Sequence, residues 1–236
     1  MASWLAVAFQ LDDHLDTQPD IDHRSLLSGL ASAVSGSNPA RGGCLETPSG
    51  LLSAFSDLYE MTTHSMAAPV RERFAGQVQE YLQALATECR QRRLRIVPSE
   101  RDYIRMRRTV GAVREAAEVA DHFEGQSLPD HLFTHPWHQQ LLDAAADVVG
   151  WRNDLASWHQ EATGGEVHNL VLVLAHTTGC SPEHAADQVR QRLRRRAHQL
   201  EALASRPPHP GLAHRAAGMR QWAKGYRRWS ADTGRY

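Results

Sequence analysis

One stretch of the sequence decides the fold class, WHQQLLDAAADVVGWRNDLASWHQEAT at residues 137–163. Its apolar residues recur at three- and four-residue spacing, as in an amphipathic helix, and it is longer than an ordinary strand. The apolar side chains of the first turns share one face: Leu142, Ala145, Ala146 and Val149. Farther along the helix, Asn153, Ser157 and Glu161 stand four residues apart, so an apolar face becomes an oxygen-bearing one near the helix end.

The rest of the chain follows the same helical pattern. Ala, Leu, Arg, Glu and Gln dominate, and no alternating apolar–polar segment is long enough to support a sheet. Ser99 and Ser181 stand where helix N-caps are expected, and Gly- and Pro-rich breakers separate the segments. The sequence therefore predicts an all-α fold, with helices over 2–17, 48–64, 69–95, 99–121, 137–163, 166–178, 182–204 and 211–230.

Composition and charge exclude several classes of protein. The 236 residues are 42% hydrophobic and 22% charged, which is typical of a globular chain. A net charge of −1 gives no general attraction to nucleic acid or to an anionic membrane, so neither is expected as a partner. No apolar run is long enough to cross a bilayer, no signal peptide is visible, and the three cysteines form no disulfide framework. We therefore expect a cytoplasmic protein.

A second oxygen-rich cluster, DDHLD at 12–16, lies at the end of the first predicted helix. Asp12 and Asp16 share one helix face, and Phe9 lies one turn before them. Carboxylates at a helix C-terminus oppose the macrodipole, and a bound cation offsets that cost. The oxygens of both clusters are hard ligands that suit Mg²⁺, and clustered Mg²⁺ suits a diphosphate. For either cluster alone, an ordinary solvated helix end is the alternative interpretation.

Together the clusters resemble the two acidic motifs of class I terpene synthases of the bacterial type. DDHLD at 12–16 and NDLASWHQE at 153–161, which matches NDxxSxxxE, begin 141 residues apart, a gap similar to the family's. RMRRTVGA at 105–112 resembles the segment that carries the family's diphosphate-sensing arginine, which falls here on Arg107. The chain ends in Arg235-Tyr236, which is similar to the family's C-terminal pair. The resemblance covers essentially the whole chain.

The resemblance implies an all-α helical bundle of the class I terpenoid synthase type around a central hydrophobic cavity. It implies one domain over 1–236 that ends at the Arg-Tyr pair and lacks the N-terminal helices, because only eleven residues precede Asp12. The implied cofactor is Mg²⁺, with three ions per site. The implied metal ligands are Asp12, Asp16, Asn153, Ser157 and Glu161, with Asp13, which would position an arginine, and Asp154 as supporting residues.

The implied substrate is a prenyl diphosphate, with farnesyl diphosphate as the first expectation. The implied reaction ionises it, cyclises the carbocation to a sesquiterpene and releases diphosphate. Arg107, Arg235 and Tyr236 would hydrogen-bond the diphosphate. For Arg107 alone, an ion pair with Asp102 on the helix surface is the alternative interpretation.

Two further kinds of residue belong to the implied catalytic set. Gly111 falls where the family breaks its helix, so that a free backbone carbonyl would face the substrate. Aromatic faces stabilise a carbocation by cation–π contact, which makes Phe9 and Trp229 candidates. Plain core packing is the alternative for both aromatic side chains.

Two other functions stay open. A chain-elongating prenyltransferase has a similar fold, but it carries two Asp-rich motifs, and NDxxSxxxE in place of the second argues against it. Gln160 stands where the family usually has Lys or Arg, which removes one cationic contact to the diphosphate. A catalytically inactive terpene synthase fragment is therefore the other alternative. Neither the product nor the chain length of the substrate follows from residue spacing, and a homodimer stays open.

Overall fold

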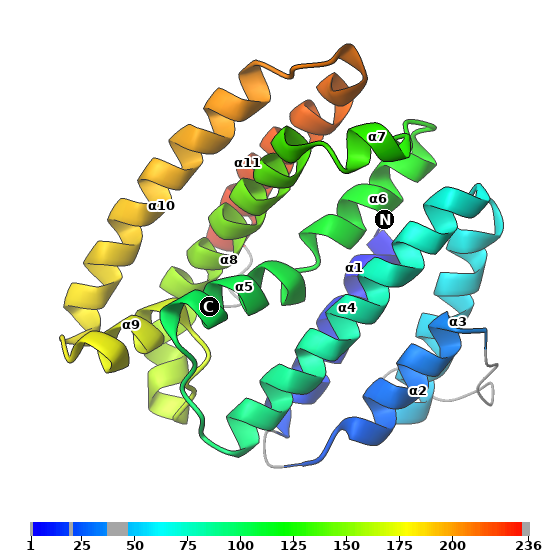
Figure 1. The fold of residues 1–236 in the computed structure, drawn as a ribbon. Coiled ribbons are helices and arrows are strands. Elements are labelled where there is room, and N and C mark those ends of the chain that lie inside the picture. Colours follow the sequence, from blue (N-terminus) through cyan, green and yellow to red (C-terminus); the bar gives the residue numbers. More distant parts are fainter. Residues whose placement is uncertain (1, 19–20, 37–46, 233–236) are drawn as a thin grey trace. The chain divides into compact units, whose positions relative to one another are not determined.

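A computed structural model describes residues 2–18, 21–36 and 47–232 (Figure 1). These residues are mainly helical and form no strand, which confirms the all-α prediction. Internal contacts divide the chain into two compact units, Met1–Leu94 with Glu118–Ser127, and Arg95–Ala117 with Leu128–Tyr236. The single domain over 1–236 stays a prediction. No helix in the described ranges is both long and apolar enough to cross a membrane.

An aromatic cluster holds the first unit together. Trp4 contacts Phe55 and Phe74 edge to face, with ring centroids 5.9 and 5.8 Å apart, and Tyr59 stacks on both phenylalanine rings. Trp4 also donates from its Nε1 to Thr62 Oγ1 at 2.9 Å, so its polar atom is satisfied. The cluster ties the N-terminal helix to two others. The helices of this unit are α1 (Ala2–Thr17), α2 (Arg24–Val34), α3 (Pro48–His64), α4 (Ala68–Arg93) and the end of α6 (Val113–Phe123).

Helix α2 is not among the helices predicted from the sequence. Its sequence RSLLSGLASAV is rich in serine and contains a glycine, residues of low helix propensity. Burial stabilises this helix instead, because one face of α2 lies in the core. The side chains on that face are at most 8% exposed: Leu26, Leu27, Leu30 and Val34. Tertiary packing therefore forms a helix that local propensity does not indicate.

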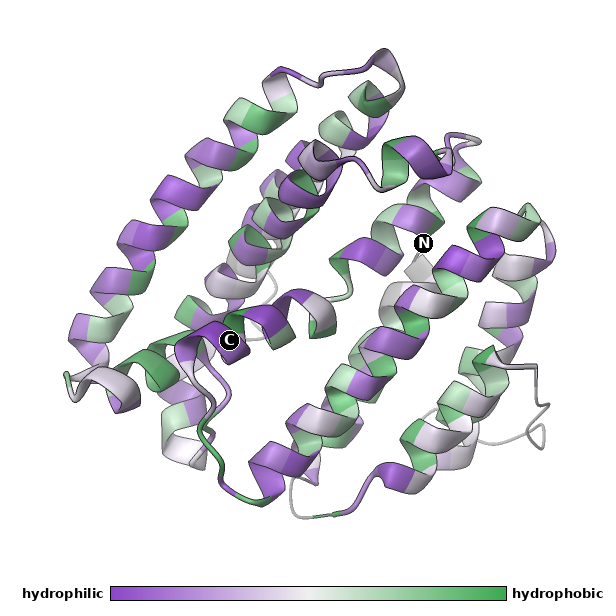
Figure 2. Cartoon of the chain, in the orientation of Figure 1, coloured by the Kyte–Doolittle hydropathy of each residue, from purple (hydrophilic) through white to green (hydrophobic). Residues whose placement is uncertain are grey.

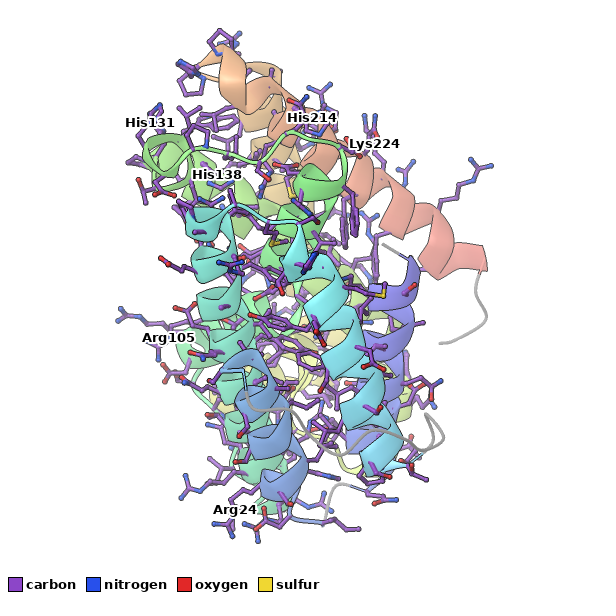
Figure 3. The ribbon with its side chains drawn as sticks, turned by 90° about the vertical axis from the view of Figure 1, so that its right-hand side faces the viewer. Arg24, Arg105, His131, His138, His214 and Lys224 are labelled. Atoms are coloured by element: carbon purple, nitrogen blue, oxygen red, sulfur yellow. The ribbon has the colours of Figure 1, made fainter. Side chains whose placement is uncertain are left out.

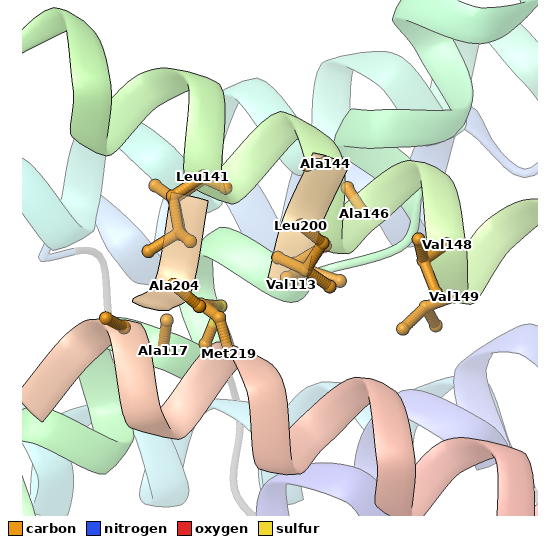
Figure 4. Close-up of a cluster of buried hydrophobic side chains, with 13 residues drawn as sticks. Val113, Ala117, Leu141, Ala144, Ala146, Val148, Val149, Leu200, Ala204 and Met219 are labelled. Carbon is orange, nitrogen blue, oxygen red and sulfur yellow. The ribbon is translucent and has the colours of Figure 1, made fainter. Parts of the chain in front are cut away.

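The second unit is organised around α8 (Pro136–Gly164), the helix formed by the decisive stretch. Its other elements are α5 (Glu100–Val110), the start of α6, α7 (Asp130–Phe133), α9 (Leu170–Thr178), α10 (Pro182–Ser205), the 3-10 helix η1 (Pro210–Leu212) and α11 (Ala213–Asp232). Helix α8 packs against α5, α9, α10 and α11. Figure 4 shows Leu141 and Val148 of α8 in one buried cluster with Met219 of α11 and Val113 of α6. Figure 2 shows the apolar first half of α9, which is buried in a second cluster.

The helix predicted over 99–121 is two helices in the structure. Helix α5 ends at Val110 and α6 begins at Val113, and Ala112 between them has a φ of 50°. This is the left-handed region, which costs a residue with a Cβ about 1–2 kcal/mol. The break falls at Gly111 and Ala112 and so includes Gly111, the position that the resemblance implies, but the positive φ belongs to the alanine.

The strain at Ala112 leads to a prediction about stability. Ala112→Gly is expected to leave the free energy of unfolding unchanged or higher, because the relief of about 1–2 kcal/mol exceeds the roughly 0.4–1 kcal/mol lost to the freer unfolded chain. Ala112→Val forces a β-branched side chain into the same conformation and is expected to destabilise. Urea unfolding of both variants checks this, and equal losses in the two variants would contradict the assigned backbone conformation.

The helix predicted over 166–178 begins later, at Leu170. Gly165 ends α8 with a φ of 73°, and the Glu166 carboxylate accepts two backbone N–H groups of the turn that follows. Asn169 then caps α9 through its side-chain oxygen. Side chains satisfy the backbone of this turn in place of helical hydrogen bonds, so the helix starts four residues after the predicted position.

Candidate functional site

Arg107 of α5 binds two consecutive side chains of α8. Its Nη2 donates to Asn153 Oδ1 at 2.6 Å, and its Nε donates to Asp154 Oδ1 at 3.1 Å. Asp102, the alternative partner considered for Arg107, is bound by Arg105 at 2.8 Å. The Arg107 side chain is 20% exposed, whereas that of Arg105 is 76% exposed and points into solvent (Figure 3). Two arginines on one short helix therefore have different environments, and only Arg107 reaches the second acidic motif.

Asp154 is a buried carboxylate that joins three helices. It is 2% exposed and accepts hydrogen bonds from the Tyr103 hydroxyl at 2.8 Å, from Arg107, and from the backbone N–H of Leu170 at 3.2 Å. Burial raises the pKa of Asp154, and the Arg107 charge and the hydrogen bonds oppose that shift. Asp154 thus connects Arg107 of α5 to the start of α9.

The three predicted ligands of α8 form a row of oxygen atoms along the helix. Ser157 donates from its Oγ to the Asn153 carbonyl at 3.0 Å. Asn169 donates from its Nδ2 to Glu161 Oε2 at 2.9 Å. Burial raises the pKa of Glu161, while the polar side chains of Ser157 and Asn169 beside it oppose that shift. Amide, hydroxyl and carboxylate oxygens are the donors that Mg²⁺ prefers, so this donor set fits that ion.

Asn153 is held at both ends of its amide group. Its Nδ2 donates to the Tyr226 hydroxyl of α11 at 3.0 Å, and its Oδ1 accepts from Arg107. The same Oδ1 is the atom that a cation would bind, so a bound cation shares it with Arg107 or displaces Arg107 from it. Sequence reasoning missed Tyr226, because no spacing relates it to the motif.

Sequence reasoning also missed Gly150. A Cβ at this position would lie 3.1 Å from Arg107 Cγ and 3.4 Å from its Nε, so the arginine side chain lies directly against the backbone of α8. Glycine inside a helix costs about 1 kcal/mol relative to alanine, and the close approach of Arg107 explains its presence here. The available signal was a glycine inside a long helix, one turn before NDxxSxxxE.

The first acidic cluster lies on α1, in the first unit. Asp12 and Asp16 are exposed and Asp13 is half-buried. Arg92 of α4 forms an ion pair with Asp16 and another with Glu88 at 3.2 Å. The positive charge offsets the cost of a carboxylate at the helix C-terminus. The resemblance implies that Asp13 positions an arginine, and this stays a prediction; the described contact with an arginine is at Asp16.

The remaining predicted site residues lie on α1, at the end of α5, or outside the described residues. Phe9 is half-buried on α1, and Gly111 lies at the break that follows α5. The side chain of Trp229, and both Arg235 and Tyr236, lie outside the described residues. Among the side chains that the structure describes, no group of three or more His, Cys, Asp or Glu is arranged to hold a metal ion. The joint action of both acidic clusters on one ligand stays a prediction.

Comparison with known proteins identifies the family. The family model "Terpene synthase family 2, C-terminal metal binding" matches residues 3–199. The chain is 29% identical to (-)-delta-cadinene synthase of Streptomyces clavuligerus over 249 residues, which cover 100% of this chain and 75% of that protein. It is 24% identical to 7-epi-alpha-eudesmol synthase ((2E,6E)-farnesyl diphosphate cyclizing) of Streptomyces viridochromogenes, covering 100% of this chain and 73% of that protein.

A solved structure shares the fold. The crystal structure of 2-methylisoborneol synthase from Streptomyces coelicolor, in complex with Mg²⁺ and geranyl-S-thiolodiphosphate, matches with a TM-score of 0.79 at 19% identity. The match covers 100% of this chain and 80% of that one. The chain belongs to the metal-binding terpene synthase family, and it is a terpene synthase with that family's helical fold.

Proposed function

We propose that this terpene synthase is a Mg²⁺-dependent cyclase that ionises farnesyl diphosphate, closes the carbocation to a sesquiterpene and releases diphosphate. The observation that carries the proposal is the pair of hydrogen bonds from Arg107 to Asn153 and Asp154, the first two residues of the NDxxSxxxE motif. It joins an arginine suited to a diphosphate with oxygens suited to Mg²⁺. The farnesyl diphosphate in one relative's name, and the Mg²⁺ and diphosphate analogue in one structural neighbour, support the substrate and the metal.

The proposed metal ligands are the oxygen-bearing side chains of the two acidic motifs. Mg²⁺ held by these side chains would supply positive charge against the negative charge that develops on the departing diphosphate. Three ions per site are part of the proposal. The residues proposed to hold them are Asp12, Asp16, Asn153, Ser157 and Glu161.

The other proposed roles belong to groups that contact the diphosphate or the carbocation. Arg107 hydrogen-bonds the diphosphate, and its planar guanidinium meets two oxygens at once. The C–O bond breaks with its electron pair on the diphosphate oxygen, and the hydrogen bonds stabilise that charge. Arg235 and Tyr236 add contacts from the C-terminal end. The Gly111 carbonyl and the aromatic faces of Phe9 and Trp229 stabilise the cation; Asp13 and Asp154 position charged neighbours.

Gly150→Ala separates the placement of Arg107 from the stability of the fold. The added methyl group gains up to about 1 kcal/mol of helix propensity. It also meets Arg107 at 3.1 Å and displaces the side chain that binds Asn153. We expect turnover of farnesyl diphosphate to fall about tenfold, since small misplacements at a reacting centre carry costs of this order or larger. Steady-state kinetics and thermal unfolding check this, and a loss of stability that parallels the loss of turnover would contradict it.

The proposed function is tested by product analysis. The purified protein is incubated with Mg²⁺ and geranyl, farnesyl or geranylgeranyl diphosphate, and the extracts are separated by gas chromatography with mass detection. The proposal expects cyclic C15 hydrocarbons or alcohols from farnesyl diphosphate. Longer prenyl diphosphates, formed only when isopentenyl diphosphate is added, would indicate a chain-elongating prenyltransferase. No product from any of the substrates would support the inactive alternative, to which Gln160 gives weight.

A further inference from the structure

A set of ion pairs fastens both arms of the broken helix α5–α6 to one face of α8. Before the break, Arg108 donates from its Nε and Nη2 to the two oxygens of Asp147 at 2.7 and 2.8 Å, and from its Nη1 to Asp143 Oδ2 at 3.0 Å. After the break, Arg114 donates from its Nη2 to Asp143 Oδ1 and from its Nη1 to Gln139 Oε1, both at 2.6 Å. These acceptors on α8 are spaced four residues apart, so they share one face.

Asp143 occupies the central position of this row. One of its oxygens accepts from Arg108 on α5 and the other from Arg114 on α6, so a single carboxylate bridges the break. Its neighbour Asp147 has a side chain that is 1% exposed and also accepts from Arg196 of α10 at 2.7 Å. Isolated surface ion pairs contribute little to stability. These pairs form a network instead, because they share the carboxylates of Asp143 and Asp147, and the Asp147 carboxylate is buried.

The bridge encloses the strained part of the backbone. Ala112, with its φ of 50°, lies between Arg108 and Arg114. A residue in a strained conformation persists when the surrounding structure fixes it from both sides, as this network does. Arg107 precedes Arg108 and Gly111 precedes Ala112, so a network that fixes the two arms also fixes both residues.

We propose that Asp143 is a positioning residue, which holds α5 and α6 in register on α8 and so sets where Arg107 meets the diphosphate and where the Gly111 carbonyl meets the carbocation. What Arg107 and Gly111 act on rests on the proposed function. The attachment of α5 and α6 to α8 through Asp143 rests on the ion pairs alone. Asp143 contacts the substrate at no step. Its removal therefore lowers the rate of the bound complex more than it weakens substrate binding.

The test uses Asp143→Asn, which keeps the shape of the side chain and removes its charge. Asp187→Asn is the matched control, because it removes an exposed ion pair with Arg190 on α10. Amide hydrogen exchange is measured by mass spectrometry without substrate, and kcat and KM are measured with farnesyl diphosphate at saturating Mg²⁺. We expect exchange over 108–116 to rise about tenfold or more while α9 keeps its protection. We expect kcat to fall about tenfold or more with KM within about threefold, and the control to match the parent.

Three results would overturn the inference. One is unchanged exchange over 108–116 in Asp143→Asn. Another is faster exchange in every segment together with a kcat loss explained by the fraction unfolded, which is the signature of a general structural role. The third is a loss confined to KM. If Asp143→Asn does not fold, Arg114→Gln takes its place, because it releases only the α6 arm. The same measurements on Arg114→Gln then test the inference by the same three results. If the parent protein has no turnover, the proposed function fails, while hydrogen exchange still shows whether Asp143 holds α5 and α6 on α8.

Discussion

Glu161→Gln is expected to abolish turnover of farnesyl diphosphate while the protein stays folded. The substitution replaces the carboxylate of the proposed ligand Glu161 by a neutral amide of the same shape, and a neutral amide binds Mg²⁺ weakly. Loss of a residue that only supports a ligand costs about 10–100-fold in metal affinity or activity, so loss of the ligand itself is expected to cost more than about a hundredfold. Diphosphate release at saturating substrate and Mg²⁺ measures the effect.

The fold is expected to tolerate this change for a structural reason. Asn169 donates to Glu161 Oε2, and the amide oxygen of glutamine accepts the same hydrogen bond. Burial already raises the pKa of Glu161, so a neutral group at this position removes a desolvation cost. Glu183→Gln, at an exposed position on α10, is the matched control and is expected to behave as the parent. Near-parental turnover of Glu161→Gln at saturating Mg²⁺ would remove Glu161 from the proposed ligands.

Arg107→Lys is expected to lower the rate of ionisation about ten- to a hundredfold, although the net charge is unchanged. Arg107 uses two different nitrogens for Asn153 and Asp154, a geometry that the single ammonium group of lysine does not reproduce. Loss of one charge-assisted hydrogen bond in the transition state, worth about 1.5–3 kcal/mol, corresponds to that decrease. The rate is measured as kcat for diphosphate release at saturating Mg²⁺.

Arg105→Lys is the matched control for this substitution. Arg105 stands on the same helix, two residues earlier, and its exposed side chain pairs with Asp102. We expect its kcat to equal that of the parent. A kcat for Arg107→Lys within about a factor of two of the parent would show that Arg107 is a structural residue and would leave the sensor role unassigned.

The helix starts and the residues that share a helix face were predictable from the sequence, because both depend on neighbouring residues alone. Ser99 and Ser181 cap α5 and α10 as predicted, since each accepts a hydrogen bond from the third residue after it. The spacing of Asn153, Ser157 and Glu161 places them along α8 because helix geometry alone determines which residues share a face. Helix α2 depends instead on the burial of its leucines, and no local propensity reports that burial.

The contacts between elements were not predictable from spacing. Arg107 was assigned to the site by resemblance, but its position against Gly150 and its pairing with Asp154 depend on how α5 crosses α8. The same is true of the bridge at Asp143, where arginines on two helices meet one carboxylate. Single-sequence reasoning identifies charged residues on a helix face but not their partners, because many pairings satisfy the same charges.

Metal-dependent release of diphosphate tests directly whether this chain ionises farnesyl diphosphate with the help of Mg²⁺. The purified protein is freed of metal with EDTA, and diphosphate is measured after conversion to phosphate by inorganic pyrophosphatase, which is added with its own metal after the reaction is stopped. We expect no release in EDTA, release that saturates as Mg²⁺ is added back, and release by Glu161→Gln at the background rate. Release that is equal with and without Mg²⁺, or a parent protein that never exceeds the Glu161→Gln background, would contradict this expectation.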